Sequence, residues 1–322
     1  MIGKKNNAET LYLVIPCYNE EEMLPITVKA LEEKMNFLIN NEKISKKSKV
    51  MLVDDGSKDK TWEIITALDE KYSFITGIKL SRNKGHQNAL LAGLMTAKDR
   101  ADIVISMDAD LQDDINAIDG MLEKRAEGCD VVYGVRSSRK KDTFFKRFTA
   151  QGFYKMLKFF GVDIVYNHAD YRLMSKRALE GLEQFKEVNL FLRGMVPMVG
   201  YKSDIVEYER NERTAGESKY PLKKMLAFAF EGVTSLSIKP IRAITAIGIT
   251  IFSVSVVFIL YFLIVWLMGK TIQGWTTIVL SVWALGGFQL LAIGIVGEYI
   301  GKIYLETKSR PKFIIETDLE KK

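Results

Sequence analysis

The sequence predicts an α/β domain with a mostly parallel sheet, followed by two membrane-spanning helices, and three observations support this fold class. Short apolar runs alternate with amphipathic segments over roughly the first 135 residues, the pattern of a parallel sheet covered by helices on both faces. Polar and acidic residues collect directly after those runs. Residues 243–269 and 271–297 contain no charged residue, and each run exceeds the ~20 residues that span a bilayer.

Strands and helices are expected in alternation through the first part of the chain. The expected strands are 11–16, 49–56, 75–81, 102–108 and 130–135. The expected helices are 19–39, 57–72, 85–98 and 114–128. The first helix is predicted to begin at Asn19, with acidic residues in its first turn, and the second at Ser57 or Asp59, because these residue types cap helices.

Polar residues follow the predicted strands where an open parallel sheet binds its ligands, at the carboxyl ends. They are Tyr18, Asn19, Glu20, Asp54, Asp55, Ser81, Arg82, Asn83, Asp108, Asp110 and Arg136. The glycine-rich dinucleotide fingerprint does not follow the first strand, and the sequence holds no Walker loop. The usual dinucleotide and P-loop signatures are therefore missing.

The stretch VISMDADLQDD places Asp108, Asp110, Asp113 and Asp114 at the end of a predicted buried strand. Two carboxylates one residue apart repel each other unless a positive charge lies between them. A divalent cation shared with a diphosphate would supply that charge, since hard cations take oxygen ligands from carboxylates and phosphates together. The structural alternative is a solvated acidic loop.

Four parts of the chain are predicted: a cytosolic domain over 1–219, an interfacial amphipathic segment over 220–240, a transmembrane hairpin over 241–301 and a basic cytoplasmic tail over 302–322. Residues 141–161 form a second basic, aromatic segment, predicted to lie at a membrane surface or to pack on the sheet. The N-terminus lacks a signal-peptide apolar region, and Lys and Arg flank the charge-free runs on their outer sides. Both termini are therefore expected in the cytoplasm and the protein in the plasma membrane.

The net charge of +6 does not indicate nucleic-acid binding, because much of the excess lies beside the predicted spans and suits anionic lipid. The lysines concerned are Lys219, Lys223, Lys224 and Lys239. Cys17 and Cys129 are too few for a disulfide framework or a zinc site. Gly297 and Gly301 form a Gly-x-x-x-Gly step that favours close helix packing and a homo-oligomer, with a lipid-facing position as the alternative.

Six short stretches stand in order along the chain: VIPCYNEEE, VDDGSKDKT, SRNKGHQNALLAGL, DADLQDD, ADYRLMSKRAL and RTAGESKY. In this order they resemble the family 2 glycosyltransferases, especially the branch that includes bactoprenol-phosphate glucosyltransferases and dolichol-phosphate mannosyltransferase. The resemblance covers nearly the whole chain and implies a GT-A fold, a Rossmann-like nucleotide-sugar-binding domain. Processive family 2 synthases carry a Gln-x-x-Arg-Trp motif that this sequence lacks, which implies a single transfer.

The resemblance also implies how the donor is held. The residues that match base and ribose contacts are Pro16, Tyr18 and Glu20. The acidic pair beside the base is matched by Asp54 and Asp55. The segment that matches the metal and diphosphate site contains Asp108, Ala109, Asp110 and Gln112, with Asp108, Asp110 and Gln112 as ligands of Mg²⁺ or Mn²⁺. The residues that match phosphate contacts are Arg136, Arg213 and Lys219. Structural alternatives are a first-turn helix acid for Glu20 and a helix cap for Asp54.

Asp170 and Arg172 match a motif near the acceptor, and with Asp110 they are the expected catalytic residues. A salt bridge between Asp170 and Arg172 is the structural alternative, and His86 and His168 are interpreted as polar neighbours. A lipid monophosphate is largely ionised near neutral pH, because its second pKa is about 6. Asp170 would then orient the acceptor or act as a weak base.

The expected function is metal-dependent, inverting transfer from a nucleotide sugar to polyprenyl (undecaprenyl) phosphate, giving a lipid-linked sugar donor for cell-envelope glycosylation. UDP-glucose is the expected donor, with UDP-N-acetylglucosamine and UDP-galactose as alternatives. Two other functions stay open: transfer to a glycolipid or polysaccharide, and a non-catalytic membrane subunit that binds nucleotide sugars.

Overall fold

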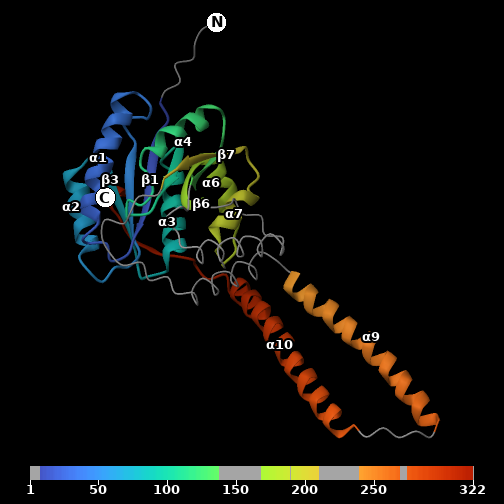
Figure 1. Ribbon diagram of the computed structural model, residues 1–322. Helices are drawn as coiled ribbons and strands as arrows, with labels where there is room; N and C mark the ends of the chain where they lie inside the picture. The colour runs from blue at the N-terminus through green and yellow to red at the C-terminus, as the bar shows by residue number, and fades with distance from the viewer. Residues whose placement is uncertain (1–7, 138–167, 189, 210–238, 269–273, 322) are drawn as a thin grey trace. The chain divides into compact units, whose positions relative to one another are not determined.

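The computed structural model describes residues 8–137, 168–188, 190–209, 239–268 and 274–321, and its chain divides into two compact units (Figure 1). The first unit takes in 1–154, 163–222 and 311–322, and the second takes in 155–162 and 223–310. The amphipathic segment predicted at 141–161, and nearly all of the one predicted at 220–240, lie outside the described residues.

A mixed sheet forms the centre of the first unit, in the strand order β7-β5-β6-β4-β1-β2-β3-β8. Its strands are β1 (Leu11–Cys17), β2 (Lys49–Asp54), β3 (Ile75–Leu80), β4 (Ile103–Ser106), β5 (Val131–Arg136), β6 (His168–Ser175), β7 (Ser203–Tyr208) and β8 (Ile315–Asp318). The first four strands run parallel, as predicted, and β7 runs parallel to β5. The sheet is nevertheless mixed, because β6 runs antiparallel to β4 and β5, and β8 runs antiparallel to β3.

Helices cover both faces of this sheet (Figure 1). One face carries α1 (Leu24–Asn40), α2 (Thr61–Lys71) and α4 (Ala117–Ala126), and the other carries α3 (His86–Lys98), α6 (Lys176–Glu183) and α7 (Leu192–Met198). Every residue of β1 is buried, with Leu11 and Leu13 in one core and Tyr12 and Val14 in the other. This division follows from the period-two alternation of side chains along a strand.

The helix predicted to begin at Asn19 begins at Leu24, so the predicted cap is wrong. Asn19 instead adopts a left-handed φ of 55° and fastens two loops together. Its backbone N–H donates to the Ser57 hydroxyl (3.0 Å), and its side-chain oxygen accepts from the backbone N–H of Lys58 (2.9 Å). The loop after β1 is thereby tied to the loop after β2.

The C-terminal residues differ from the tail predicted over 302–322. Within that range the second unit's helix α10 (Trp275–Lys308) ends, and β8 joins the edge of the sheet on β3. The short helix η1 (Leu319–Lys321) follows, and Leu319 is buried in the core at 6% exposure. Charge alone suggested a tail, whereas the apolar residues within this segment provide a strand and a core contact.

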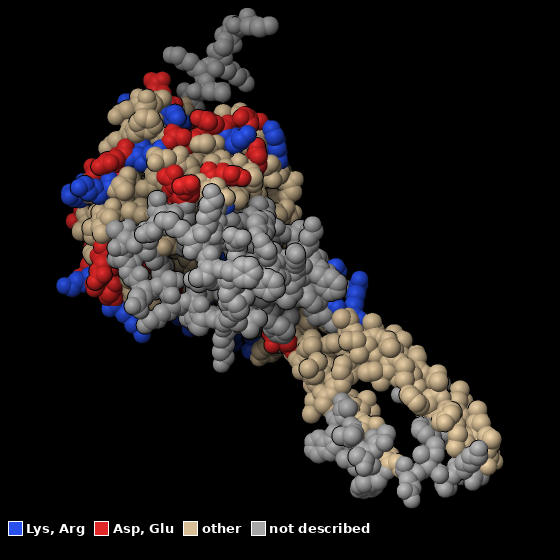
Figure 2. All heavy atoms as spheres, viewed as in Figure 1, with Lys and Arg blue, Asp and Glu red and all other residues tan. Residues whose placement is uncertain are grey.

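The second unit contains α9 (Lys239–Leu267) and α10, which contact each other. Most of their visible described surface carries neither basic nor acidic side chains, in contrast to the first unit (Figure 2). Within the described residues, one helical stretch, Leu285–Lys308, is long and apolar enough to cross a membrane, with a mean hydropathy of 1.3. Ile241–Ile251 forms a shorter apolar stretch, so two membrane spans remain a prediction.

Candidate active site

The carboxyl ends of β1, β2 and β4 meet at one edge of the sheet because these strands run parallel. The register pairs Cys17 with Asp54, and Val14 with Ser106. The segments that leave these strands therefore emerge side by side, which is where open α/β sheets bind their ligands.

A pocket of about 240 Å³ opens at this edge. It is lined by Pro16, Cys17, Tyr18, Glu20, Asp55, Asn83, Gly85, His86 and Ala89. Four of the five residues predicted at or beside the nucleotide base and ribose thus line one pocket. Among the lining residues Tyr18 carries the one phenol ring, at 41% exposure, and an exposed ring can stack on a base.

Asp54, the fifth of these predicted residues, does not line the pocket. It is fully buried, one carboxylate oxygen accepts from the backbone N–H of Ser57 (3.2 Å), and burial raises its pKa. Asp55 accepts from the backbone N–H groups of Lys84 (2.7 Å) and Gly85 (2.9 Å). Both carboxylates therefore shape the loops around the pocket, and Asp55 also borders it.

The turn after β4 carries the predicted metal segment. The Asp110 carboxylate accepts from the backbone N–H of Gln112 (3.2 Å), and Leu111 between them has a left-handed φ of 54°. The carbonyl of Ala109 accepts from the Thr27 hydroxyl (2.6 Å), which ties the turn to α1. The turn is thus held from two sides.

Negative charge is concentrated at this turn. Burial raises the pKa of Asp108 to about 6; the charge of His86 lowers it, while neighbouring carboxylates, Asp113, Asp170 and Asp110, raise it further. In the part of the chain that the structure describes, no three His, Cys, Asp or Glu side chains are grouped to hold a metal. Mg²⁺ is commonly held by one or two carboxylates, with substrate phosphates and water completing the shell. Asp108 and Asp110 fit a divalent cation of that kind.

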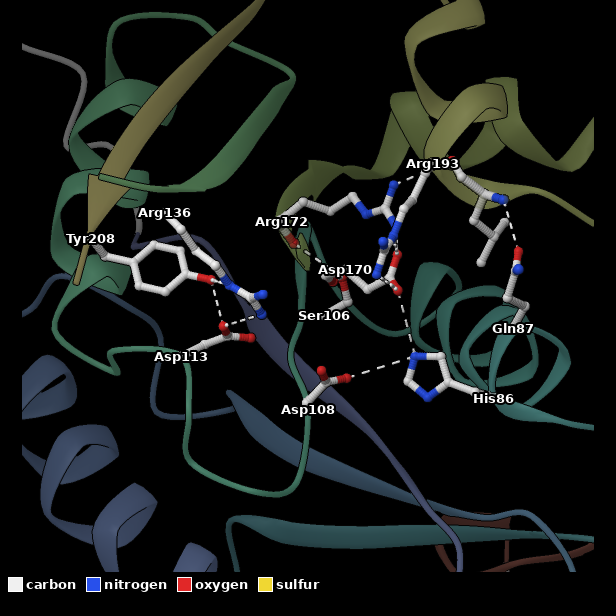
Figure 3. A network of polar contacts seen from close by, with 11 residues as sticks. His86, Gln87, Ser106, Asp108, Asp113, Arg136, Asp170, Arg172, Arg193 and Tyr208 are labelled. Carbon is white, nitrogen blue, oxygen red and sulfur yellow. Dashed lines mark hydrogen bonds and ion pairs between the residues drawn. The ribbon is translucent and has the colours of Figure 1, made fainter. Parts of the chain in front are cut away.

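Asp170 lies at the centre of a polar network (Figure 3). Its carboxylate accepts from Nη2 of Arg172 (2.7 Å), and from Nε (3.3 Å) and Nη2 (3.0 Å) of Arg193. Burial alone would raise its pKa, but Arg193, His86 and Arg172 outweigh burial and hold the pKa well below its usual range. Asp170 is therefore a firmly ionised carboxylate and a weak proton acceptor. The predicted Asp170–Arg172 salt bridge is present.

The register between β4 and β6 explains how Asp108 and Asp170 come together. Ser106 pairs with Arg172 in the antiparallel ladder, so the residues two positions beyond, Asp108 and Asp170, leave the sheet opposite each other. The Ser106 hydroxyl donates to the carbonyl of Asp170 (2.5 Å) and fixes this arrangement. Asp108 and Asp170 are far apart in the sequence, and only the antiparallel strand brings them together.

His86 lies between these two carboxylates. Its Nε2 is 3.7 Å from Oδ1 of Asp108 and 3.7 Å from Oδ2 of Asp170 (Figure 3). Burial lowers the pKa of His86, but the neighbouring carboxylates of Asp170 and Asp108 raise it overall. His86 also lines the pocket, so it connects the predicted donor site with Asp170.

Arg136, predicted to contact phosphate, lies apart from this network. Its Nη2 is 3.3 Å from Oδ1 of Asp113, and its Nε is 3.4 Å from the hydroxyl oxygen of Tyr208. The Tyr208 hydroxyl donates to the same buried carboxylate. The structure therefore places Arg136 in an ion pair, and its phosphate contact stays a prediction. Arg213 and Lys219 lie outside the described residues.

The sequence analysis did not identify Arg193 as a site residue, and it interpreted His86 only as a polar neighbour. Arg193 stands in the stretch NLFLRGMVPMVG, where a single cation within an apolar run is a weak signal of a functional side chain. His86 begins a helix directly after the third strand, a position that does predict a place at the ligand edge.

The part of the chain that contains these elements is similar to known proteins. Residues 12–182, from within β1 to within α6, match the family described as glycosyl transferase family 2. YkoT of Bacillus subtilis (strain 168), named as an uncharacterized glycosyltransferase, is 53% identical, and the match covers 98% of this chain and 94% of that protein.

Two further relatives carry more specific names. The prophage bactoprenol glucosyl transferase homolog of Escherichia coli (strain K12) is 40% identical, with 94% of this chain and 97% of that protein covered. The bactoprenol glucosyl transferase of Shigella phage SfV is also 40% identical, with 96% and 99% covered. These similarities extend over nearly the full length of each chain.

Proposed function

The chain belongs to glycosyltransferase family 2, and on that premise we propose that it transfers a sugar from UDP-glucose to undecaprenyl phosphate at the cytoplasmic face of the membrane. The product would be a polyprenyl-phosphate sugar that donates its sugar to cell-envelope glycosylation. Relatives named bactoprenol glucosyl transferase, similar over nearly the whole chain, support this acceptor class and glucose as the sugar.

The observation that carries the proposal is the state of Asp170. A hydroxyl acceptor must lose a proton during transfer, and a carboxylate with a strongly lowered pKa accepts protons poorly. A phosphate monoester needs no such base, because its oxygen is ionised near neutral pH. As the predicted base, Asp170 is therefore better suited to a phosphate acceptor than to a glycolipid or polysaccharide hydroxyl.

The reaction is a single displacement at the anomeric carbon of the sugar. An oxygen of the acceptor phosphate forms a bond to that carbon, and the bond to the diphosphate breaks with its electron pair leaving on UDP. Attack opposite the leaving group inverts the configuration. The pocket holds the base and ribose between Pro16, Tyr18, Glu20 and Asp55, and Asp170 orients the acceptor side of the site.

Mg²⁺ or Mn²⁺ would be held by Asp108 and Asp110, with Gln112 as the further predicted ligand. When bound, the ion neutralises the charge that develops on the leaving diphosphate. The crowded carboxylates at this turn support such a site, since a cation would relieve their mutual repulsion.

The test uses the full chain purified in detergent, with radiolabelled UDP-glucose and Mg²⁺. We expect label in the lipid extract when undecaprenyl phosphate is supplied, and none when undecaprenol, which has the same tail and a hydroxyl head, replaces it. Parallel reactions with UDP-N-acetylglucosamine and UDP-galactose define the sugar, and EDTA tests the metal. Transfer to undecaprenol, or to endogenous polysaccharide alone, would contradict the proposed acceptor.

A further inference from the structure

The network around Asp170 gathers three basic side chains around one carboxylate. Two guanidinium groups contact Asp170, and His86 approaches it from the other side (Figure 3). Asp108, the second carboxylate that His86 approaches, lies on the His86 side, so the positive charge of the network is concentrated at the two arginines. Such a concentration of charge attracts an anionic ligand.

The side chains of the two arginines differ in their exposure to solvent. The Arg172 side chain is 0% exposed and is enclosed by the fold, with its Nη1 donating to the carbonyl of Leu192 (3.3 Å). The Arg193 side chain is 37% exposed, although it contacts the same buried carboxylate. Arg193 is therefore the arginine of this pair that a ligand can contact directly.

Contacts with neighbouring elements also hold Arg193 in place. It stands in the first turn of α7, directly after Leu192, whose backbone N–H donates to the Gln87 side chain (3.0 Å). Gln87 is the second residue of α3, next to His86 in the wall of the pocket. The start of α7 is thus fastened to the helix that borders the donor pocket, and Asp170 fixes the plane of the guanidinium.

We propose that Arg193 binds the phosphate of the lipid acceptor, with Asp170 positioning its guanidinium; this inference rests on the proposed function. A guanidinium carries five N–H donors in one plane, so it can hold a carboxylate and a phosphate at the same time. The acceptor oxygen would then lie beside His86, where the donor pocket and the Asp170 network meet.

The test compares Arg193→Gln, Arg193→Lys and the control Arg177→Gln. Arg177 is a matched control because it also pairs with a buried aspartate, Asp130, but lies outside the candidate site. For each protein, the KM for undecaprenyl phosphate is measured at saturating UDP-glucose, and the KM for UDP-glucose at saturating acceptor. Thermal unfolding checks that each variant is folded.

Loss of one charged contact to phosphate should raise the acceptor KM of Arg193→Gln by roughly 10- to 100-fold. Arg193→Lys keeps the charge without the planar fork and should give a smaller rise. The donor KM should change by less than about twofold in both, and Arg177→Gln should match wild type. A lower kcat with an unchanged acceptor KM would mean that Arg193 only positions Asp170. A raised donor KM would mean that Arg193 contacts the diphosphate of the donor. Either result overturns the proposal.

A second measurement separates this inference from the proposed function. Binding of radiolabelled undecaprenyl phosphate to the detergent-purified protein is measured without donor, using the same three variants. If the wild-type protein binds the lipid phosphate but transfers no sugar to it, the proposed reaction is refuted. The binding affinities of wild type and the Arg193 variants can still be compared in that case. Equal binding by wild type and both Arg193 variants would refute the phosphate contact. If Arg193→Gln does not fold, Arg193→Lys decides both measurements.

Discussion

The hydroxyl of Tyr12 donates a hydrogen bond to Glu320, with 2.9 Å between the two oxygens, although the residues lie near opposite ends of the chain. Lys49 (3.0 Å) and Arg100 (2.8 Å) also contact Glu320, and Arg100 contacts Asp318. The C-terminal segment is thus fastened to β1 by Tyr12, to β2 by Lys49 and to the turn after α3 by Arg100. Residues 311–322 are therefore part of the first unit, which contains the candidate active site.

Leu319→Ala should destabilise this unit, because Leu319 is buried in the core whereas Ile314 in the same segment is 56% exposed. Truncating a buried leucine costs about 2–5 kcal/mol, which corresponds to a fall in Tm of roughly 5–15 °C for a unit of this size. Thermal unfolding of the purified full chain measures the change. Ile314→Ala is the matched control, and an equal fall in both variants would contradict the packing of Leu319.

The same strand constrains membrane topology. Residues 8–137, 168–188, 190–209 and 311–321 belong to one unit with one sheet, so they lie on the same side of any membrane. The intervening chain must therefore cross an even number of times or not at all, which agrees with the two spans predicted from the sequence. Reporters fused at Met1 and after Lys322 should both be active only in the cytoplasm. Opposite locations of the two reporters would contradict β8 in its observed place.

Asp110→Ala should abolish metal-dependent donor binding and reduce transfer by at least ~10³-fold, because an uncompensated diphosphate is a poor leaving group. Isothermal titration with UDP-glucose, with and without Mn²⁺, measures the first effect. Asp114→Asn is the control: Asp114 caps the backbone at Asn116 (2.9 Å), a contact that asparagine preserves. Near-normal turnover of folded Asp110→Ala would remove Asp110 from the metal site.

The pH dependence of Asp170→Asn separates the two acceptor classes. The pKa of Asp170 in the folded protein lies below its unfolded value of about 4, so its ionisation stabilises the fold above about pH 4, and this contribution is lost only as the pH falls through the lowered pKa. Its charge is therefore constant between about pH 6 and 9. A fall in rate towards pH ~6 should then come from protonation of the acceptor phosphate and of Asp108, whose pKa is raised to about 6, and not from Asp170.

Wild type and Asp170→Asn should consequently slow in parallel as the pH is lowered from ~8 to ~6. At the higher pH the variant should lose less than the roughly 10²- to 10⁴-fold that a general base contributes. Single-turnover rates at saturating donor measure both effects. A loss of a thousandfold or more at pH ~8, with donor affinity intact, would make Asp170 an obligatory base or positioning group.

Gly56→Ala should damage the pocket more than the equivalent change at Gly200. Both glycines have positive φ, 63° and 77°, so both substitutions strain the backbone. A Cβ on Gly56 would lie 2.6 Å from the backbone carbonyl carbon of Arg82 and the backbone nitrogen of Asn83, whereas one on Gly200 meets its nearest atom at 3.9 Å. The donor KM should rise for Gly56→Ala alone, and equal kinetics in both variants would show that this close approach is unimportant.

The sequence by itself determined the parallel half of the sheet and the acidic edge of the site. Wholly apolar strands alternating with helices have few arrangements, and their polar carboxyl ends must then meet; Tyr18, Asp55 and Asp108 were found in this way. These are local signals, because periodicity and strand ends can be read from adjacent residues.

Only the tertiary structure decided what β6, α7 and β8 contribute. The antiparallel register of Ser106 with Arg172 places Asp170 opposite Asp108, and α7 then brings Arg193 onto the same carboxylate. Asn19 fastens a neighbouring loop and does not cap a helix, and Glu320 meets Tyr12 across the sheet. Each of these contacts joins residues distant in sequence, and their energy depends on burial and charge pairing that exist only once the strands are assembled, so no local pattern encodes them.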